Sequence, residues 1–107
     1  MDLRQASYVV AVADHGTFTA AAASIPVSQP ALSQAIAALE RELGAELFHR
    51  IGRRVVLTAA GEAFVEPARR MLRDAEVARS VVGDIAGLTA GRLDIVALPS
   101  LVVEPLV

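Results

Sequence analysis

The sequence has no cysteine, no lysine and no tryptophan, and aromatic residues make up only 4% of its 107 residues. Without cysteine the chain cannot form a disulfide scaffold or a thiolate metal site. Its two histidines, His15 and His49, are too few for a metal cluster. We therefore expect no metal and no cofactor within these residues. Any hydrophobic core has to be aliphatic and rich in alanine, since 54% of the residues are apolar.

Long apolar stretches are also missing. No run approaches the roughly 18 residues that a membrane span needs. The N-terminal residues MDLRQ lack the basic region and the long apolar region of a secretory signal. These absences predict a cytoplasmic protein that has no membrane partner, and the length fits one small domain with or without an appendage.

The charges are unevenly distributed along the chain, although the net charge is only −2. Residues 47–73 contain six arginines and two glutamates, a net of +4, whereas the other residues contain four arginines and ten acids, a net of −6. A local basic surface can bind phosphates even when the whole chain is acidic. The acidic balance therefore does not exclude nucleic acid.

The first 24 residues show the periodicity of two helices. We expect the first helix over residues 2–14, stopped by Gly16, and a second, short helix capped by Thr17. The expected inward face of the first helix consists of Leu3, Ala6, Val10 and Ala13, with Val9 and Val12 beside them.

Residues 28–43 are expected to form a third helix. Ser28 stands at the capping position, Pro30 lies in the first turn, where a missing N–H costs nothing, and Gly44 ends the helix. Its apolar stripe consists of Leu32, Ile36, Leu39 and Leu43. The opposite face begins with short polar groups, not with the long charged side chains that are usual on a solvated face: Gln29, Ser33 and Gln34.

A hairpin and a long helix are expected to follow. The segments LFHR and RVVLT predict two short strands around a turn at Gly52, with several arginines near the tip. A helical pattern then runs from Thr58 to about Leu88, and Pro67 should either kink this helix or mark its true start. Helix, helix, turn, helix and hairpin is the order of a winged helix-turn-helix. The expected fold class is mainly α with a small β-hairpin, followed by a long linker helix.

The long helix carries an apolar seam of three heptads. Its members are Phe64, Ala68, Met71, Ala75, Ala78, Val82 and Ile85. The seam could pack on the rest of the same chain or on a partner helix. At about 1.5 Å per residue it extends for about 30 Å, which is longer than the small domain can cover, so a partner helix is the favoured explanation.

One long stretch resembles the LysR-type transcriptional regulators. The family pattern is A-A-x-x-L-x-x-S-Q-P-A-L-S-x-x-I-x-x-L-E-x-x-L-G-x-x-L-F-x-R-x-x-R-x-V-x-L-T-x-A-G. Residues 21–61 read AAASIPVSQPALSQAIAALERELGAELFHRIGRRVVLTAAG, which agrees at every fixed position except Ile25. Gln34 also stands where arginine or lysine is frequent in the family. The resemblance extends from residue 1 to about residue 98.

The resemblance implies a bacterial regulator with three regions. These would be a winged helix-turn-helix DNA-binding domain at 1–58, a linker and dimerisation helix at 59–88, and the start of an effector-binding domain at 89–107. Most of that last domain would lie outside this sequence, and a small-molecule inducer would bind there. The implied partners are double-stranded DNA and a second copy, in an antiparallel homodimer through the linker helix, with a higher oligomer possible in the full-length protein. Such a regulator would act in the cytoplasm, on the nucleoid.

The third helix and the hairpin supply the expected DNA contacts. A glutamine can pair with the N6 and N7 edge of adenine, a proline can touch a thymine methyl, and an arginine can enter a narrow minor groove. The expected base contacts, from the 28–43 helix in the major groove and the 48–57 wing at the minor groove, are Gln29, Pro30, Ser33, Gln34 and Arg53. The expected phosphate contacts are Thr17, Ser28, Arg50 and Arg54. Capping alone could also explain Thr17 and Ser28, and Arg50 could instead pair with a helix carboxylate.

The sequence bears on three classes of function. The favoured one is sequence-specific DNA binding by a dimer that addresses an inverted repeat. The alternative is a dimerisation or interaction module that does not bind specific DNA independently, but the basic hairpin argues against that as the sole role. An enzyme is not expected, because the sequence offers no pairing of nucleophile and base, no metal cluster and no phosphate-binding glycine loop.

Overall fold

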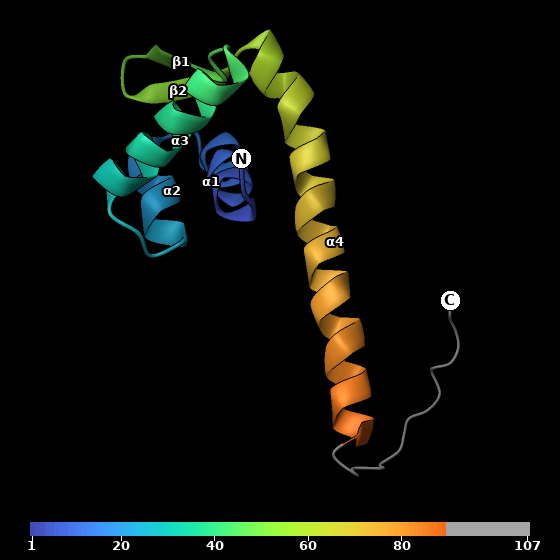
Figure 1. Cartoon of the computed structure of the whole chain (residues 1–107). Coiled ribbons are helices and arrows are strands. Elements are labelled where there is room, and N and C mark those ends of the chain that lie inside the picture. The colour runs from blue at the N-terminus through green and yellow to red at the C-terminus, as the bar shows by residue number, and fades with distance from the viewer. Residues whose placement is uncertain (90–107) are drawn as a thin grey trace. The chain divides into compact units, whose positions relative to one another are not determined.

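The computed structural model describes residues 1–89. In chain order its elements are α1 (Leu3–His15), α2 (Phe18–Ser24), α3 (Gln29–Leu43), β1 (Phe48–Ile51), β2 (Arg54–Leu57) and α4 (Ala59–Thr89) (Figure 1). This order confirms the predicted winged helix-turn-helix fold with a long helix after it. Residues 90–107, which fall in the implied start of an effector-binding domain, lie outside the described residues. The chain divides into two compact units, Met1–Asp74 and a second that begins at Ala75.

Each of the first three helices begins at a polar cap. In α1, Asp2 accepts a hydrogen bond from the backbone N–H of Gln5 at 2.8 Å, while the Gln5 side chain accepts one from the N–H of Asp2 at 3.1 Å. Thr17 Oγ1 accepts from Ala20 N at 3.0 Å in α2, as predicted. Gly16 ends α1 with a φ of 79°, in the left-handed region that glycine adopts without strain. These local signals fix the helix bounds close to those expected.

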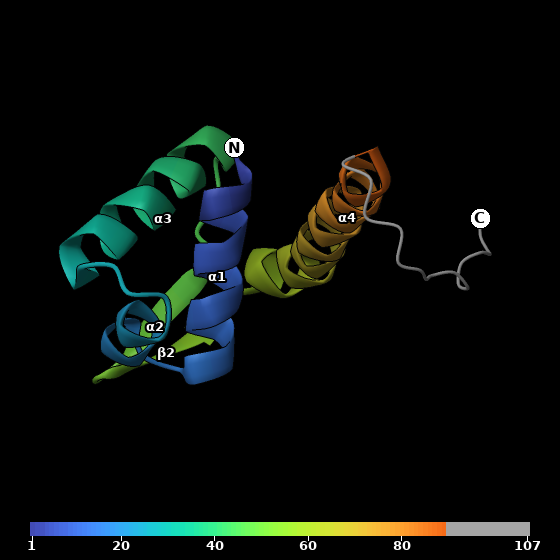
Figure 2. The same cartoon turned by 90° about the horizontal axis from the view of Figure 1, so that it is seen from below.

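The three helices pack against one another (Figure 2). Together with the hairpin they enclose a mainly aliphatic core. Its largest fully buried side chains are Leu32, Ile36, Leu39, Leu47, Val9 and Val12. Burying a leucine or isoleucine side chain of this kind contributes about 1.5–3 kcal/mol. The predicted stripe of α3 is confirmed except at its end, because Leu43 lies in the last turn of α3 and is 41% exposed.

The inward face of α1 differs from the prediction. Leu3 is exposed, and Val10 and Ala13 are only partly buried, whereas Tyr8, Val9 and Val12 lie in the core. The helix packs on both α2 and α3 and therefore buries a wide face. Residues 9–13 are all small and apolar, so periodicity alone could not choose among the possible faces there.

The hairpin is antiparallel, with Phe48 opposite Leu57 and Ile51 opposite Arg54. A two-residue turn joins its strands, and Gly52 occupies the first turn position with a φ of 63°. The backbone N–H of Val55 donates to the carbonyl of Gly16 at 2.9 Å. This bond ties the wing to the turn between α1 and α2.

The first half of α4 belongs to the first compact unit. Thr58 Oγ1 accepts from Gly61 N at 3.0 Å and so caps the helix. Pro67 lies inside α4, so the alternative that it marks the start of the helix is wrong. Phe64 packs against the core and Ala68 is fully buried within the chain. The first compact unit therefore includes the first half of α4 and continues to Asp74.

The described part of the second unit is the remainder of α4. Large apolar side chains on this segment are exposed to between 50% and 65%: Val77, Val81, Val82 and Ile85. Among the described residues, no helix is long and apolar enough to cross a membrane.

Candidate nucleic-acid interface

The N-terminal turn of α3 presents the polar groups expected to read DNA. Ser28 Oγ accepts from Ala31 N at 3.1 Å, which confirms its role as the cap. Its hydroxyl proton remains available to a further acceptor. Gln29, Pro30 and Gln34 are exposed, and Ser33 is partly buried. These side chains therefore lie on a face of α3 that does not pack against the core.

Two of these side chains contact each other. Gln29 Nε2 donates to Ser33 Oγ at 3.2 Å, across one turn of the helix. One amide hydrogen and the carbonyl oxygen of Gln29 have no hydrogen-bond partner among the described residues. A free donor beside a free acceptor is the pairing that the N6 and N7 edge of adenine requires. The contact with Ser33 also restricts the rotamers of Gln29 before any ligand arrives.

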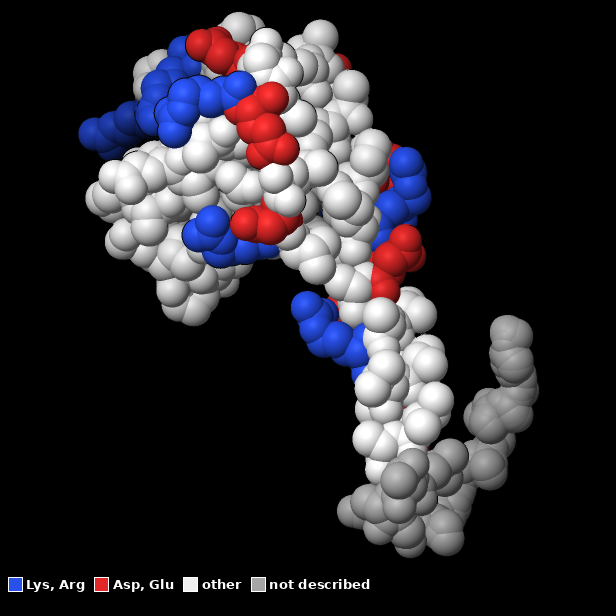
Figure 3. Space-filling view, in the orientation of Figure 1, with Lys and Arg blue, Asp and Glu red and all other residues white. Residues whose placement is uncertain are grey.

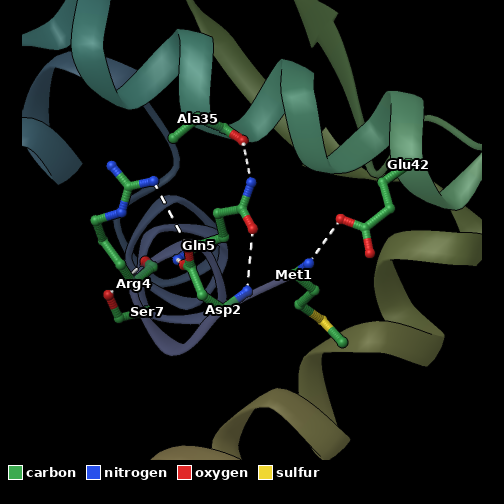
Figure 4. A network of polar contacts seen from close by, with 7 residues as sticks. All are labelled: Met1, Asp2, Arg4, Gln5, Ser7, Ala35 and Glu42. Carbon is green, nitrogen blue, oxygen red and sulfur yellow. Dashed lines mark hydrogen bonds and ion pairs between the residues drawn. The ribbon is translucent and has the colours of Figure 1, made fainter.

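A network of polar contacts holds α3 in place (Figure 4). Gln5 is nearly buried, and its Nε2 donates to the backbone carbonyl of Ala35 at 3.2 Å. The N-terminal ammonium of Met1 pairs with Glu42 at 2.7 Å. Sequence reasoning missed both contacts. A buried amide that is fully hydrogen-bonded favours one arrangement of the elements it joins, because alternatives leave polar groups unsatisfied.

Glu40 links α3 to the wing. Its Oε2 accepts from the backbone N–H of Leu47 at 2.7 Å, just before β1 begins. Thr58, just after β2, closes the same end of the hairpin, where its Oγ1 donates to the carbonyl of Glu46 at 2.6 Å. These two side chains explain how a four-residue strand pair holds a fixed place beside α3.

The arginines fall into two groups. Those on α1 and α4 are paired with carboxylates: Arg4 with Asp2, Arg69 with Asp14, Arg70 and Arg73 with Glu66, and Arg79 with Glu76. Within residues 1–89, the arginines without an ion pair are Arg41, Arg50, Arg53 and Arg54. The unpaired positive charge of segment 47–73 thus lies on the hairpin. Arginine side chains project from the surface there (Figure 3).

Within residues 1–89, Arg50 does not form the alternative ion pair with a helix carboxylate. Its guanidinium lies over the ring of Phe18, with the guanidinium carbon 4.7 Å from the ring centroid. Both residues line an open pocket of about 420 Å³, whose wall also includes Ser33 of α3. The pocket therefore joins the exposed face of α3 to the wing.

The bridge between Asp14 and Arg69 fastens α4 to α1. Two hydrogen bonds, of 2.6 Å and 3.3 Å, join the guanidinium to the carboxylate. The hydrogen bond from Arg69 lowers the pKa of Asp14, and the same bond raises the pKa of Arg69. Sequence reasoning missed this pairing, which joins residues far apart in the chain.

The residues predicted for a dimer interface fall into two groups. Phe64 and Ala68 pack within the first unit, and Ala68 has no accessible surface left for a partner to cover. Met71 and Ala75 are partly buried, whereas Ala78, Val82 and Ile85 are exposed. The exposed part of the seam therefore lies in the second unit.

Comparison with known proteins identifies this arrangement. The family described as bacterial regulatory helix-turn-helix protein, lysR family, matches residues 3–62, which is more than half of the chain. The chain belongs to the lysR family. The matched residues of this LysR-family chain include all of α1, α2, α3 and the hairpin.

Two curated relatives illustrate the likeness. The SDS degradation transcriptional activation protein of a Pseudomonas species is 46% identical over 98 residues, which cover 92% of this chain and 32% of the relative. The HTH-type transcriptional regulator TfdT of Cupriavidus pinatubonensis is 51% identical over 72 residues, or 67% of this chain and 32% of the relative. This LysR-family chain thus spans about a third of the length of these relatives.

A solved structure agrees with the fold. The crystal structure of the CbnR DBD–DNA complex has a TM-score of 0.75 and 43% sequence identity, and the match covers 80% of this chain and 99% of that chain. The likeness extends over nearly the whole of that protein chain, which was crystallised with DNA.

Proposed function

We propose that the chain is the DNA-binding part of a transcriptional regulator and recognises a specific sequence in double-stranded DNA. The observation that carries the proposal is the exposed polar start of α3 beside a wing whose three arginines have no carboxylate partner within residues 1–89. Family membership and the likeness to a domain crystallised with DNA support it. As a bacterial regulator it would act in the cytoplasm, on the nucleoid.

The proposed roles divide between bases and phosphates. In this scheme α3 enters the major groove, where Gln29, Pro30, Ser33 and Gln34 contact base edges, and Arg53 enters the adjacent minor groove. The phosphate contacts are Thr17, Ser28, Arg50 and Arg54. Phosphate contacts supply most of the affinity and its salt dependence, while base contacts supply discrimination.

A homodimer formed through α4 would place two copies of α3 on an inverted repeat. The support is the exposed apolar surface of the second unit, where Val77, Val81 and Val82 are 59%, 50% and 65% exposed. Three such side chains within two helical turns are costly to leave in water, and an antiparallel copy of the same helix would cover them. The proposed interface therefore consists of Met71, Ala75, Ala78, Val82 and Ile85, extended by Val77 and Val81.

The direct test is binding of the chain to a random pool of short duplexes at low and moderate salt, followed by sequencing of what stays bound. The proposal expects an enriched inverted repeat and an affinity that falls steeply with salt. Binding without an enriched motif would show that the chain binds DNA only through phosphates, without sequence specificity. Failure to bind at either salt would favour the alternative, a dimerisation module.

The dimer needs a separate test. Sedimentation of the chain should give twice the chain mass, and Val81→Glu should give a monomer, because the interface would bury an unpaired charge. Glu76→Gln is a matched control, since Glu76 is exposed and pairs only with Arg79 in the described residues. A monomeric wild-type chain at concentrations where it binds the repeat would contradict the proposed interface.

A further inference from the structure

The ring of Phe18 has two neighbours from the same strand. Phe48 meets it edge-on, with the centroids 6.2 Å apart and the rings at 81°. Arg50 follows Phe48 by two residues, and side chains two apart on a strand point to the same face. The guanidinium of Arg50 lies over the ring, with its carbon 4.7 Å from the centroid. Phe18 therefore contacts two side chains from one face of β1, an aromatic ring and a cation.

Within the described residues, no carboxylate pairs with this cation. Arg50 makes no ion pair within residues 1–89, although Glu40 and Glu46 line the same pocket. Glu40 instead accepts a hydrogen bond from Leu47 N, on its Oε2. Among the described residues, the ring of Phe18 is thus the contact that fixes the position of the exposed Arg50 guanidinium.

A guanidinium that meets an aromatic ring through its flat face keeps its hydrogen-bonding edge free, because its five N–H donors point outward in its plane. Those donors match the oxygens of a phosphate. A side chain whose rotamers are already restricted also loses less conformational entropy when it binds.

We propose that Phe18 is a positioning residue for DNA binding, whose ring holds Arg50 so that the guanidinium edge meets a backbone phosphate. This inference rests on the proposed function. Phe18 would then do more than begin α2 and pack against the core. Arg50 would be oriented for its phosphate before the DNA binds. Arg50 shares a pocket with Ser33 of α3, so the phosphate would lie beside the groove that α3 enters.

The test measures affinity for the selected duplex over a range of salt concentrations, in four proteins: wild type, Phe18→Leu, Arg50→Gln and the double variant. Arg50→Gln should reduce the salt slope by roughly one unit. Phe18→Leu should weaken binding about two- to fivefold, the size of an exposed cation–π contact, and move the slope toward that of Arg50→Gln. The double variant should behave as Arg50→Gln alone. Phe18→Tyr, which keeps the ring, should restore the wild-type values.

Phe64→Leu is the matched control. Phe64 is also a partly buried aromatic residue packed on the core, but no arginine lies over its ring in the described structure. Its loss should leave the salt slope unchanged after correction for any unfolded fraction. If Phe18→Leu also leaves the slope unchanged, or if the losses in the double variant simply add, the inference is wrong.

A second variant leaves the core intact. Arg50→Lys keeps the charge but removes the flat, forked donor group, and should also weaken binding about two- to fivefold in the wild-type background. Full affinity in Arg50→Lys would overturn the inference even if Phe18→Leu does not fold. Wild-type protein that binds no duplex at any salt would instead contradict the proposed function itself.

Discussion

The side-chain amide of Gln5 donates a 3.2 Å hydrogen bond to the backbone carbonyl of Ala35, 30 residues further along the chain. The same side chain accepts from the N–H of Asp2. One nearly buried group therefore caps α1 and holds the middle of α3, the helix proposed to enter the major groove. The same contact therefore stabilises the fold and positions the proposed binding surface.

Gln5→Ala should destabilise the fold by about 1–3 kcal/mol, because it leaves buried backbone groups without their partner. Urea unfolding followed by circular dichroism measures the change. Ser7→Ala is the control, since the hydroxyl of Ser7 makes a solvent-exposed bond, and only to the carbonyl of Arg4 one turn earlier in the described structure. That change should stay within about 0.5 kcal/mol. Equal unfolding midpoints for the two variants would show that the Gln5 contact adds nothing.

Gly61→Ala should be among the most damaging single substitutions in the chain. A Cβ at this position would overlap the backbone carbonyl oxygen of Leu47 and lie 2.8 Å from Leu57 Cδ2. Backbone cannot yield as a flexible side chain can, so we expect a loss of about 1–3 kcal/mol from overpacking, measured by thermal unfolding.

Gly83→Ala is the matched control for that substitution. Gly83 also lies in α4, but a Cβ there meets nothing within 4 Å. Alanine at an open helical site should stabilise the helix by up to about 1 kcal/mol. Opposite signs for the two variants are expected, and a neutral Gly61→Ala would mean that α4 starts further from the Leu47 loop.

The pair formed by Asp14 and Arg69 should make stability depend on pH. Since the pKa of Asp14 is lowered in the folded state, its contribution is complete above the ordinary aspartate pKa of about 3.9. It is lost as the pH falls through the lowered native pKa. Because both side chains are partly exposed, the contribution should be about 0.2–1 kcal/mol.

Arg69→Gln tests this contribution. The variant should be less stable than the wild type near neutral pH and should approach it as the pH falls through the lowered native pKa of Asp14, where the carboxyl becomes protonated in both proteins. An NMR titration should show the pKa of the Asp14 carboxyl rising toward its ordinary value. Arg70→Gln, whose partner is Glu66, should leave that pKa where it is. An unchanged Asp14 titration in Arg69→Gln would show that the bridge does not persist in solution.

Arg54→Ala should weaken binding to all duplexes alike and flatten the salt slope by roughly one unit, as expected for loss of one phosphate contact. Arg54 is exposed and has no ion pair within residues 1–89, so the core should not be disturbed. Affinities for two unrelated duplexes at three salt concentrations measure the effect. A loss confined to one sequence would reassign Arg54 to base reading.

Local signals allowed most of the fold to be predicted from the sequence. Ser28, Gly16 and Gly44 act within one helical turn, and the residues that set the hairpin turn lie between its strands. What could not be predicted depends on distant segments meeting. The local sequence around Gln5 does not indicate its bond to Ala35. The local sequence around Arg69 likewise does not indicate its bridge to Asp14.

The same distinction applies to the candidate site. The exposed start of α3 could be predicted because the apolar stripe fixes which side faces the core, and Gln29, Ser33 and Gln34 lie on the other side. The state of the arginines could not be predicted, because it depends on which carboxylate or ring each one meets in space. Arg69 proved to be paired, and Arg50 proved to lie over Phe18.

The central claim is that the first turn of α3 reads base edges while the wing binds phosphates. Its most direct test is the affinity of the wild type and Gln29→Ala for the selected duplex and for every single-base variant of it, at one salt concentration. The account predicts that Gln29→Ala loses about 1–3 kcal/mol of discrimination at one base pair of each half-site and keeps it elsewhere. If Gln29→Ala weakens every duplex by the same factor, Gln29 reads no base and the proposed division of roles is wrong.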